Sequence, residues 1–266
     1  MKSNKPSITA VVPAAGVGSR MKADKPKQYL SLQNQSILEH TIYKLLSHPN
    51  IEHVIVVIGQ DDPYFNGLSI ASDVRVTCVN GGQERADSVL AGLMYLKDKL
   101  SIQVKSSTHT RSSANTVEAS SSLKAQPLTT AALLDEWVLV HDAARPCIQM
   151  SDIDRLLDTC FAHDAGGILA CPVRDTMKRS TSGVAIDHSV DRQGLYHALT
   201  PQMFKLDELL PAIENALLEG STITDEASAM ERMGQAPLIV QGRADNIKVT
   251  QPEDLALAEF YLQKDK

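Results

Sequence analysis

Short apolar runs alternate along the chain with segments of helical periodicity. Six runs are rich in β-branched residues and have the length of buried strands: 8–12, 54–58, 74–79, 137–141, 167–171 and 238–240. Between them, apolar residues recur at spacings of three and four, as in segments 37–46, 89–96 and 153–160. Alternation of this kind is typical of a mostly parallel, twisted sheet that helices cover on both faces. The pattern therefore predicts an α/β fold.

A further helix is expected near the C-terminus. Thr250 and Glu253 have the spacing of a capping box, and Pro252 falls in the first turn, where proline is tolerated. The apolar face of this helix is expected to contain four residues: Leu255, Leu257, Ala258 and Tyr261. The last segment of the chain is therefore predicted to be amphipathic.

Two segments interrupt the alternation. Residues 101–130 contain 13 serines and threonines in 30 positions without periodicity, so they predict a surface loop, which we extend to 101–136 as an insertion. In residues 174–200, polar and apolar positions alternate around the turn signal Ser182-Gly183, which predicts a two-stranded ribbon that projects from the body. A ribbon without its own core packs on something else, and a second copy of the chain is the simplest partner. We thus expect one Rossmann-like domain, 1–266, and a homodimer that uses the ribbon.

Composition and charge narrow the class of protein. The net charge of −6 excludes a global basic field for nucleic acid, and no apolar run approaches the ~20 residues of a membrane helix. The apolar run after Lys2 and Lys5 spans about five residues, which is too short for a signal peptide. The four cysteines lack Cys-x-x-Cys spacing and are expected to be buried thiols: Cys78, Cys147, Cys160 and Cys171. We expect a soluble cytoplasmic protein without nucleic-acid or membrane partners.

A glycine loop after the first predicted strand is the strongest local signal of chemistry. The stretch 13–21, "PAAGVGSRM", places Arg20 after two glycines, and Lys25 and Lys27 follow a few residues later. Backbone N–H groups of such loops wrap phosphates, and basic side chains neutralise them. A dinucleotide fingerprint needs a third glycine where Met21 stands, and a Walker A motif needs a Lys-Ser/Thr pair that is absent. A glycine turn without a ligand stays open, but the basic residues favour a nucleoside triphosphate.

Asp142 follows the predicted strand 137–141. A carboxylate at the C-terminal end of a strand can hold Mg²⁺ against triphosphate oxygens, or it can cap the next turn. From the residues alone, both interpretations of Asp142 stand. The adjacent His141 points the opposite way if the strand continues, so we interpret it as structural.

Several blocks, taken in order, resemble one known family. They are "PAAGVGSRM" with "KPKQY" (25–29), "GGQERADSVLAGL" (81–93), "VLVHDAARPC" (138–147), "PVRDTMKR" (172–179), "ALTPQ" (198–202), "TDEASAMER" (224–232) and "GRADNIKVTQPEDLALAE" (242–259). Together they are similar to the cytidylyltransferases that act on 2-C-methyl-D-erythritol 4-phosphate in the non-mevalonate isoprenoid pathway. The resemblance spans nearly the whole chain except residues 101–136. It implies transfer of CMP from CTP to this polyol phosphate, with Mg²⁺ or another divalent cation as cofactor.

The resemblance implies nucleotide contacts in the glycine loop and in a second loop near residues 82–88. These contacts are Pro13, Ala14, Ala15, Gly16, Gly18, Ser19, Gly82, Gln83, Ser88 and Ala143. In similar enzymes the second loop reads the pyrimidine largely through backbone groups, and a small pocket there favours cytosine over a purine. Gln83 departs from the family pattern, because relatives often carry an acidic residue at that position.

Four cations are implied to act in catalysis. Arg20 and Lys27 would stabilise the charge on the triphosphate in the transition state, and Arg192 and Lys248 would orient the attacking phosphate. That phosphate would attack the α-phosphorus of CTP in line, so that pyrophosphate leaves and 4-CDP-2-C-methyl-D-erythritol forms. The attacking phosphate is already anionic, so no general base is required.

The resemblance also implies a set of contacts to the acceptor substrate. They are Asp142, Arg145, Thr176, Arg192, Thr200, Thr224 and Lys248. Thr176 and Arg192 lie in the predicted ribbon and would come from the neighbouring subunit of the homodimer. With the resemblance, the metal is the favoured interpretation of Asp142. Asp225 either joins that metal site or caps the following helix through Glu226.

Three rival functions differ in specific features. A ribitol 5-phosphate cytidylyltransferase would share the triphosphate loop and differ in the polyol pocket. A non-catalytic nucleotide sensor has little need for so many cations that stabilise a transition state. A nicotinamide-dependent dehydrogenase is disfavoured by Met21 and by the missing acidic residue at the end of the second predicted strand.

Overall fold

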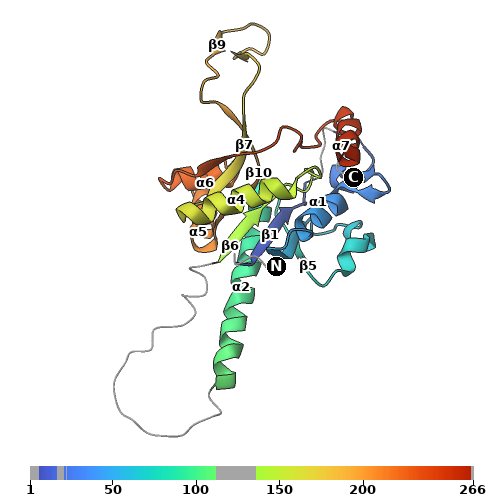
Figure 1. Cartoon of the computed structure of the whole chain (residues 1–266), viewed down its shortest axis with the longest axis vertical. Coiled ribbons are helices and arrows are strands. Elements are labelled where there is room, and N and C mark those ends of the chain that lie inside the picture. The colour runs from blue at the N-terminus through green and yellow to red at the C-terminus, as the bar shows by residue number, and fades with distance from the viewer. Residues whose placement is uncertain (1–5, 17–20, 22, 112–135, 265–266) are drawn as a thin grey trace.

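A seven-stranded sheet forms the centre of the computed structural model, which describes residues 6–16, 21, 23–111 and 136–264 (Figure 1). In spatial order the strands are β11 (Leu238–Gln241), β7 (Gly167–Pro172), β10 (Tyr196–Lys205), β6 (Trp137–Val140), β1 (Ile8–Pro13), β4 (Ile51–Ile58) and β5 (Val76–Asn80). Strand β10 runs antiparallel to both of its neighbours, whereas the other six strands are mutually parallel. The predicted mostly parallel sheet and its six strands are confirmed.

Helices cover both faces of the sheet. Helices α1 (Ile37–Leu46) and α4 (Met150–His163) pack on one face, and helices α2 (Arg85–Arg111), α5 (Leu206–Leu218) and α6 (Glu226–Arg232) pack on the other. Strand β1 serves both layers, because Ala10 and Val12 belong to the first hydrophobic cluster and Val11 to the second. This follows from the alternation of side chains along a strand. The predicted α/β fold with helices on both faces is confirmed.

Short elements connect these layers. They are the 3₁₀ helices η2 (Lys27–Tyr29), η3 (Phe65–Gly67) and η4 (Ser69–Ser72), and the small hairpin of β2 (Ser31–Leu32) and β3 (Gln35–Ser36). Helix α1 begins with a capping box in which Ser36 and Glu39 bond reciprocally. Glu39 also accepts hydrogen bonds from Ser69, so the same carboxylate fixes the start of η4.

Helix α7 (Glu253–Lys264) confirms the predicted C-terminal helix but not its cap or its full apolar face. The carboxylate of Asp254, and not that of Glu253, accepts hydrogen bonds from the backbone N–H and hydroxyl of Thr250. Leu257, predicted on the apolar face, is exposed, while Leu262 is buried. The buried face of α7 therefore contains Ala258 and Leu262 and differs from the predicted face at Leu257.

Strand β10 is the strand of the central sheet that the sequence pattern does not predict. The prediction assigned residues up to 200 to the ribbon, whereas β10 begins at Tyr196 and continues to Lys205 between β6 and β7. A proline within an apolar run argues against a central strand, and Pro201 interrupts this one. The structure accommodates it where the pairing with β7 shifts register between Ala198 and Gln202.

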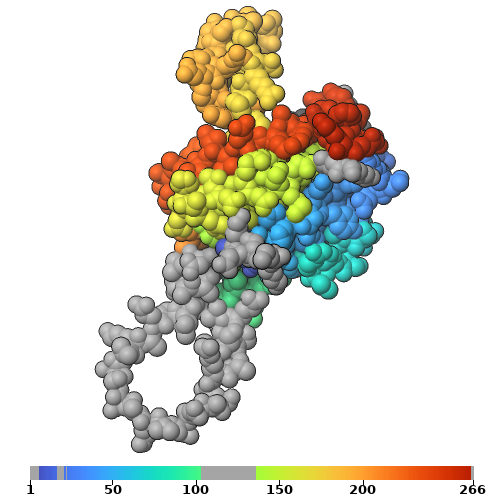
Figure 2. Space-filling model, viewed as in Figure 1, coloured from blue at the N-terminus to red at the C-terminus, as the bar shows by residue number. Residues whose placement is uncertain are grey.

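The predicted ribbon is present as strands β8 (Met177–Arg179) and β9 (His188–Val190). It protrudes from the body on the side opposite to the long helix α2 (Figures 1 and 2). Gly183 has a φ of +72° at the tip, a conformation that suits glycine. Val184 and Ile186 are exposed by 94% and 63% on the ribbon. The use of this ribbon in a dimer stays a prediction.

The predicted surface loop at 101–136 is wrong in its first part. Helix α2 continues through residue 111, because a helix that has been started by buried residues such as Val89 and Leu93 grows at little cost per residue. The rest of the segment, 112–135, lies outside the described residues. Within the described ranges, no helix has both the length and the apolar character to cross a membrane.

The cysteines follow the prediction at three of four positions. Cys147, Cys160 and Cys171 are buried free thiols, but Cys78 is exposed on the edge strand β5. An edge strand has a neighbour on one side alone, so its side chains are covered less completely than those of the central strands.

Gly166 offers a test of core packing. A Cβ atom placed on this residue would lie 2.1 Å from Cδ1 of the buried Phe204 ring. We expect Gly166→Ala to lower the free energy of unfolding by about 1–3 kcal/mol, because overpacking forces a core ring out of its position. Urea denaturation measures the change. Gly67→Ala is the matched control, because a Cβ there meets nothing within 4 Å. Equal midpoints for the two variants would contradict the expected rigidity around Phe204.

Candidate active site

A cavity of about 330 Å³ opens at the C-terminal ends of β1 and β6. Strand β1 has β4 on one side and β6 on the other, so the chain connections diverge at this point of the sheet. Ligands bind at such switch points in α/β folds. The cavity is lined by Pro13, Ala14, Ala15, Gly16, Lys27, Gln28, Gln83, Glu84, Arg85, Ser88, Asp142, Ala143, Ala144, Lys248 and Thr250.

Most of the predicted nucleotide contacts meet in this cavity. The structure brings together seven of them at its wall, beside the predicted catalytic Lys27: Pro13, Ala14, Ala15, Gly16, Gln83, Ser88 and Ala143. Gly18, Ser19 and Arg20 lie outside the described residues. Gly82 is exposed beside the cavity and does not line it. The positions agree with a shared site, while the roles of these residues stay predictions.

The second predicted loop is held close to the start of α2. A Cβ on Gly81 would lie 2.6 Å from Oγ of Ser88, and a Cβ on Gly82 would lie 2.3 Å from Cβ of Asp87. The two glycines therefore allow the loop to fold back on the first turn of the helix. This close approach places Gln83 and Ser88 at the cavity wall.

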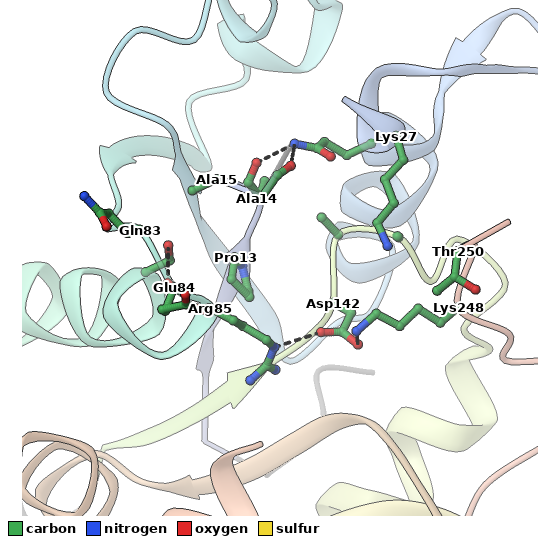
Figure 3. Close-up of a pocket in the computed structure, with 15 residues that line it drawn as sticks. Pro13, Ala14, Ala15, Lys27, Gln83, Glu84, Arg85, Asp142, Lys248 and Thr250 are labelled. Carbon is green, nitrogen blue, oxygen red and sulfur yellow. Dashed lines mark hydrogen bonds and ion pairs between the residues drawn. The ribbon is translucent and has the colours of Figure 1, made fainter. Parts of the chain in front are cut away.

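Two lysines reach the cavity from distant parts of the chain. Lys27 extends from η2, and its Nζ donates a hydrogen bond to the carbonyl oxygen of Val249 at 3.0 Å. Nζ of Lys248 lies 3.0 Å from Oδ2 of Asp142. Figure 3 shows both lysine side chains on the same side of the cavity, with Asp142 between Lys248 and Arg85. Two cations thus flank a space that is large enough for a phosphorylated ligand.

Three basic side chains surround the carboxylate of Asp142. Nε of Arg85 donates to Oδ1 at 3.1 Å and Lys248 contacts Oδ2 (Figure 3). Nε of Arg145 donates to Oδ2 at 3.2 Å. Burial by itself would raise the pKa of Asp142, but the charges of Arg85, Lys248 and Arg145 hold that pKa well below its ordinary value. The side chain is therefore an ionised carboxylate at the floor of a cationic site.

Arg85 is a residue of the site that the sequence analysis missed. Its guanidinium forms two hydrogen bonds with the carboxylate of Glu226, of 2.7 Å and 3.0 Å, in addition to the bond with Asp142. Burial would lower the pKa of Arg85, but Glu226 and Asp142 raise it above its ordinary value. Arg85 stands in the first turn of α2, where the helix dipole disfavours a cation. The two carboxylates offset that unfavourable position.

Arg145 and Thr200, predicted to contact the acceptor, lie behind Asp142 and do not line the cavity. Arg145 is 8% exposed and donates to the carbonyl oxygen of Asn246 at 2.7 Å. The hydroxyl of Thr200 accepts a hydrogen bond from the backbone N–H of Asp142 at 3.0 Å and pairs with Nδ1 of His141 at 3.1 Å. Both side chains therefore fix the position of Asp142 in this structure.

His141 is fully buried, as its structural interpretation requires. Its Nε2 lies 3.1 Å from the carbonyl oxygen of Arg145, and Nδ1 pairs with Thr200. Burial lowers the pKa of His141 to about 4, so the imidazole is neutral at physiological pH. The interpretation of His141 as a structural residue is confirmed.

The remaining predicted acceptor contacts lie outside the cavity of their own chain. Thr176 and Arg192 are exposed on the ribbon, where the guanidinium of Arg192 donates to the carbonyl oxygen of Arg174. Thr224 is exposed before α6. Lys248 is the predicted acceptor contact that lines the cavity together with Asp142. Some of the predicted acceptor contacts thus lie at or directly behind the cavity, whereas Thr176, Arg192 and Thr224 are exposed away from it.

Asp225 caps helix α6, but not through the predicted partner. Its Oδ1 accepts from the backbone N–H of Ser228 at 3.0 Å, while the side chain of Glu226 binds Arg85. Oδ2 of Asp225 accepts from Nε2 of Gln202 at 2.8 Å. Both carboxylate oxygens of Asp225 are therefore engaged in holding the start of α6.

The donor set of the cavity suits a shared metal site better than a cage built by the protein alone. Among the described residues, no group of three or more His, Cys, Asp or Glu side chains is arranged to hold a metal ion. Mg²⁺ in nucleotide-binding sites usually takes one or two carboxylates together with phosphate oxygens and water. The carboxylate of Asp142 at the cavity wall meets that smaller requirement.

Removal of the Arg85 guanidinium tests the buried network. We expect Arg85→Met to lower the free energy of unfolding by about 3–5 kcal/mol, because Glu226, only 1% exposed, then keeps a buried charge without its cation. The double variant Arg85→Met/Glu226→Gln should recover a large part of that loss. Urea denaturation of the wild type, both single variants and the double variant gives the coupling. Independent, additive losses would contradict the expected pairing.

Comparisons with known proteins identify one family that matches nearly the whole chain. The chain matches the family described as 2-C-methyl-D-erythritol 4-phosphate cytidylyltransferase over residues 8–107 and 109–264. A relative of that name from Vibrio parahaemolyticus is 53% identical over 266 residues, which cover 100% of both chains. A relative of the same name from Vibrio vulnificus is 54% identical over 260 residues, which cover 98% of this chain and 96% of the relative.

Solved structures agree with this result. A crystal structure of 4-diphosphocytidyl-2C-methyl-D-erythritol synthase superimposes with a TM-score of 0.73 at 33% identity, covering 97% of this chain and 99% of the other. The Francisella tularensis 2-C-methyl-D-erythritol 4-phosphate cytidylyltransferase gives a TM-score of 0.71 at 28% identity, covering 96% and 99%. The match extends over nearly the whole length of each chain. The chain belongs to the 2-C-methyl-D-erythritol 4-phosphate cytidylyltransferase family.

Proposed function

We propose that this protein transfers CMP from CTP to 2-C-methyl-D-erythritol 4-phosphate and releases pyrophosphate. The observation that carries the proposal is the cavity at the switch point of the sheet, where Lys27, Lys248 and Asp142 meet in a chain of this family. A triphosphate and a phosphate monoester are both strongly anionic, so their approach to each other requires local positive charge. The lysines supply that charge in a protein whose net charge is −6.

The nucleotide would lie between the glycine loop and the loop at residues 82–88. Ala14 and Ala15 line the cavity on the side of the glycine loop, and Gln83 and Ser88 line it on the side of the second loop. We assign the phosphates to the side of Gly16 and Lys27, together with the predicted Arg20. The pyrimidine then lies toward Ser88, where the small pocket discriminates against a larger purine by shape.

The transfer step needs alignment more than covalent help from the protein. An anionic oxygen of the acceptor phosphate forms a bond to the α-phosphorus of CTP, while the bond from that phosphorus to the bridging oxygen breaks. The electron pair of the broken bond leaves with pyrophosphate. Lys248 would hold the attacking phosphate in line, and Lys27 would stabilise the charge that develops on the triphosphate. No proton has to be removed from the nucleophile.

A divalent cation, most simply Mg²⁺, would be held by Asp142. When bound, such an ion neutralises phosphate oxygens of the triphosphate. The chain's own contribution is to keep Asp142 ionised, through the charges of Arg85, Lys248 and Arg145, and to fix its backbone through Thr200. Asp225 is not assigned to the metal in this proposal, because it caps α6 and, unlike Asp142, does not line the cavity.

We further propose that the ribbon of one subunit completes the active site of the other. Thr176 and Arg192 are exposed and do not line the cavity of their own chain. The ribbon also exposes Val184 and Ile186, which a partner surface would cover. A homodimer of one domain per chain, residues 1–266, would account for both features. Location in the cytoplasm stays a prediction.

Mixed dimers test the sharing of sites. A Lys27→Ala subunit paired with an Arg192→Ala subunit should regain about half of the wild-type activity, since one of its two sites keeps both native residues. Each variant alone should be strongly impaired. Two different affinity tags allow the mixed dimer to be purified and its composition proven before the assay. Absence of recovery in such purified heterodimers would count against the shared site.

The substrates are tested by pyrophosphate release. The protein with Mg²⁺, CTP and 2-C-methyl-D-erythritol 4-phosphate should release pyrophosphate rapidly, whereas ATP or UTP in place of CTP should support far slower release. Ribitol 5-phosphate in place of the methylerythritol phosphate tests the alternative acceptor. Faster release with ribitol 5-phosphate would overturn the proposed acceptor but not the nucleotide.

A further inference from the structure

Gln28 is a buried polar residue of the cavity wall to which the proposed reaction gives no role. It is the middle residue of η2, next to Lys27, and is only 3% exposed. Its Nε2 donates hydrogen bonds to the carbonyl oxygen of Ala14 at 2.6 Å and to that of Gly16 at 3.0 Å. One side-chain amide therefore holds two carbonyl groups of the glycine loop.

These bonds determine how the loop presents its backbone. The N–H of Ala14 donates to the carbonyl oxygen of Val57 in β4 at 2.7 Å, so Ala14 is held at both its N–H and its carbonyl. A trans peptide is planar, and its C=O and N–H point in opposite directions. With the carbonyl of Ala14 directed at Gln28, the N–H of Ala15 is directed to the opposite side. Ala14 and Ala15 both line the cavity (Figure 3).

The geometry of η2 links this loop to Lys27. In a 3₁₀ helix three residues complete a turn, so the side chains of three consecutive residues leave in three directions. Lys27 reaches the carbonyl oxygen of Val249, Gln28 reaches the glycine loop, and the hydroxyl of Tyr29 donates to Asp62 at 2.8 Å. Gln28 is thus the connection between the backbone that would bind phosphates and the segment that carries the lysine.

We propose that Gln28 is a positioning residue for the nucleotide. It orients the peptide groups from Ala14 to Gly16 toward the triphosphate of CTP and sets the distance between that segment and Lys27. The amide is suited to this task because its two N–H groups serve two carbonyl oxygens at once. A carboxylate of the same shape has no N–H to donate. This inference rests on the proposed function, since it takes the ligand of the cavity to be CTP.

Binding of CTP alone provides the first test. Titration calorimetry with CTP and Mg²⁺, without acceptor, should show a dissociation constant about 10- to 100-fold higher for Gln28→Glu and Gln28→Leu, because two buried carbonyl groups lose their donor. In steady-state assays the KM for CTP should rise and kcat should fall, while the KM for the polyol phosphate changes little. Tyr29→Phe is the matched control, because it loosens the same short helix on the side away from the glycine loop.

The pH profile of Gln28→Glu provides a readout that general loosening would not change. A protonated glutamic acid can donate one O–H to a loop carbonyl, and burial raises the pKa of such a carboxyl group. The activity of Gln28→Glu relative to the wild type should therefore increase as the pH falls from 8 to about 6. Gln28→Leu should show no such recovery. If Gln28→Leu does not fold, the isosteric Gln28→Glu carries the test.

Wild-type affinity for CTP in both Gln28 variants would overturn the proposal. Equal increases in KM for both substrates, matched by Tyr29→Phe, would also overturn it, because they would indicate a loss of stability alone. The proposed function fails separately: a wild-type protein that binds CTP but transfers nothing to the polyol phosphate refutes the acceptor and leaves the calorimetric test of Gln28 intact. A wild-type protein that does not bind CTP refutes both.

Discussion

Lys27→Ala is expected to lower the turnover number by about 10²- to 10³-fold, the usual effect of removing one group that stabilises transition-state charge. Nζ of Lys27 lies at the cavity and makes a hydrogen bond with the carbonyl oxygen of Val249 at 3.0 Å. That bond shows where the ammonium group is held before a phosphate competes for it. As negative charge moves onto the departing pyrophosphate, a cation at this position gains more in the transition state than in the ground state. The effect should therefore appear mainly in kcat.

The fold should survive this substitution. The hydrogen bond to Val249 is only partly buried and its loss costs about 1 kcal/mol, so urea denaturation should show a small shift in midpoint. Lys97→Ala is a suitable control, because Lys97 is an exposed lysine of α2 outside the cavity. Near-normal turnover in Lys27→Ala, with the fold intact, would refute the assignment of Lys27 as catalytic. A comparable loss in Lys97→Ala would show that the assay responds to overall charge.

The parts of the fold that the sequence predicted are those with a local signal. Buried parallel strands appear as continuous apolar runs, and β1, β4 and β6 are such runs with nearly no exposed side chain. Strand β10 carries Thr200, Pro201 and Gln202 in its middle, so its pattern is broken, although it lies in the interior of the sheet between β7 and β6. Its place is decided by pairing with distant strands, which no local window contains.

The same distinction applies to the candidate site. The sequence predicts Lys27 and Asp142 because charged residues beside a glycine loop or after a strand have a chemical meaning of their own, whereas Lys248 is predicted only through the resemblance of its stretch to the family. Arg85 and Gln28 were missed, because each is defined by a contact across the fold: Arg85 with Asp142 and Glu226, Gln28 with the carbonyls of the glycine loop. In the sequence alone, a polar residue that is buried by tertiary contacts looks like a surface residue.

Asp142→Asn should have the second large effect, and it should act on both activity and stability. The substitution preserves shape but removes the charge that Arg85, Arg145 and Lys248 share. Arg145 is 8% exposed, so it would keep a buried positive charge without the carboxylate beside it. We expect the free energy of unfolding to fall by about 3–5 kcal/mol and kcat to fall by about 10²-fold or more. Urea denaturation and the pyrophosphate assay measure the two effects.

The pH dependence of the stability difference identifies its cause. The pKa of Asp142 is lowered in the folded state, so its carboxylate stabilises the fold fully at pH values above the ordinary aspartate pKa of about 3.9. That stabilisation is lost as the pH falls from there toward the folded-state pKa. The difference in unfolding free energy between the wild type and Asp142→Asn should therefore be constant from about pH 8 to pH 5 and shrink below about pH 4.

A control separates charge from shape. Asp225→Asn also removes a carboxylate that accepts two hydrogen bonds, one from Gln202 and one from Ser228. Asp225 lies at the start of α6, and the ion pairs of the described residues include none between it and a basic side chain. The substitution should cost only about 1 kcal/mol and leave kcat close to the wild type, because asparagine caps a helix about as well as aspartate and only one hydrogen-bond acceptor is lost. A stability difference for Asp142→Asn that stays unchanged down to pH 3 would contradict the electrostatic account. In that case the loss would come from altered hydrogen bonding around Asp142, and the three cations would not depend on its charge.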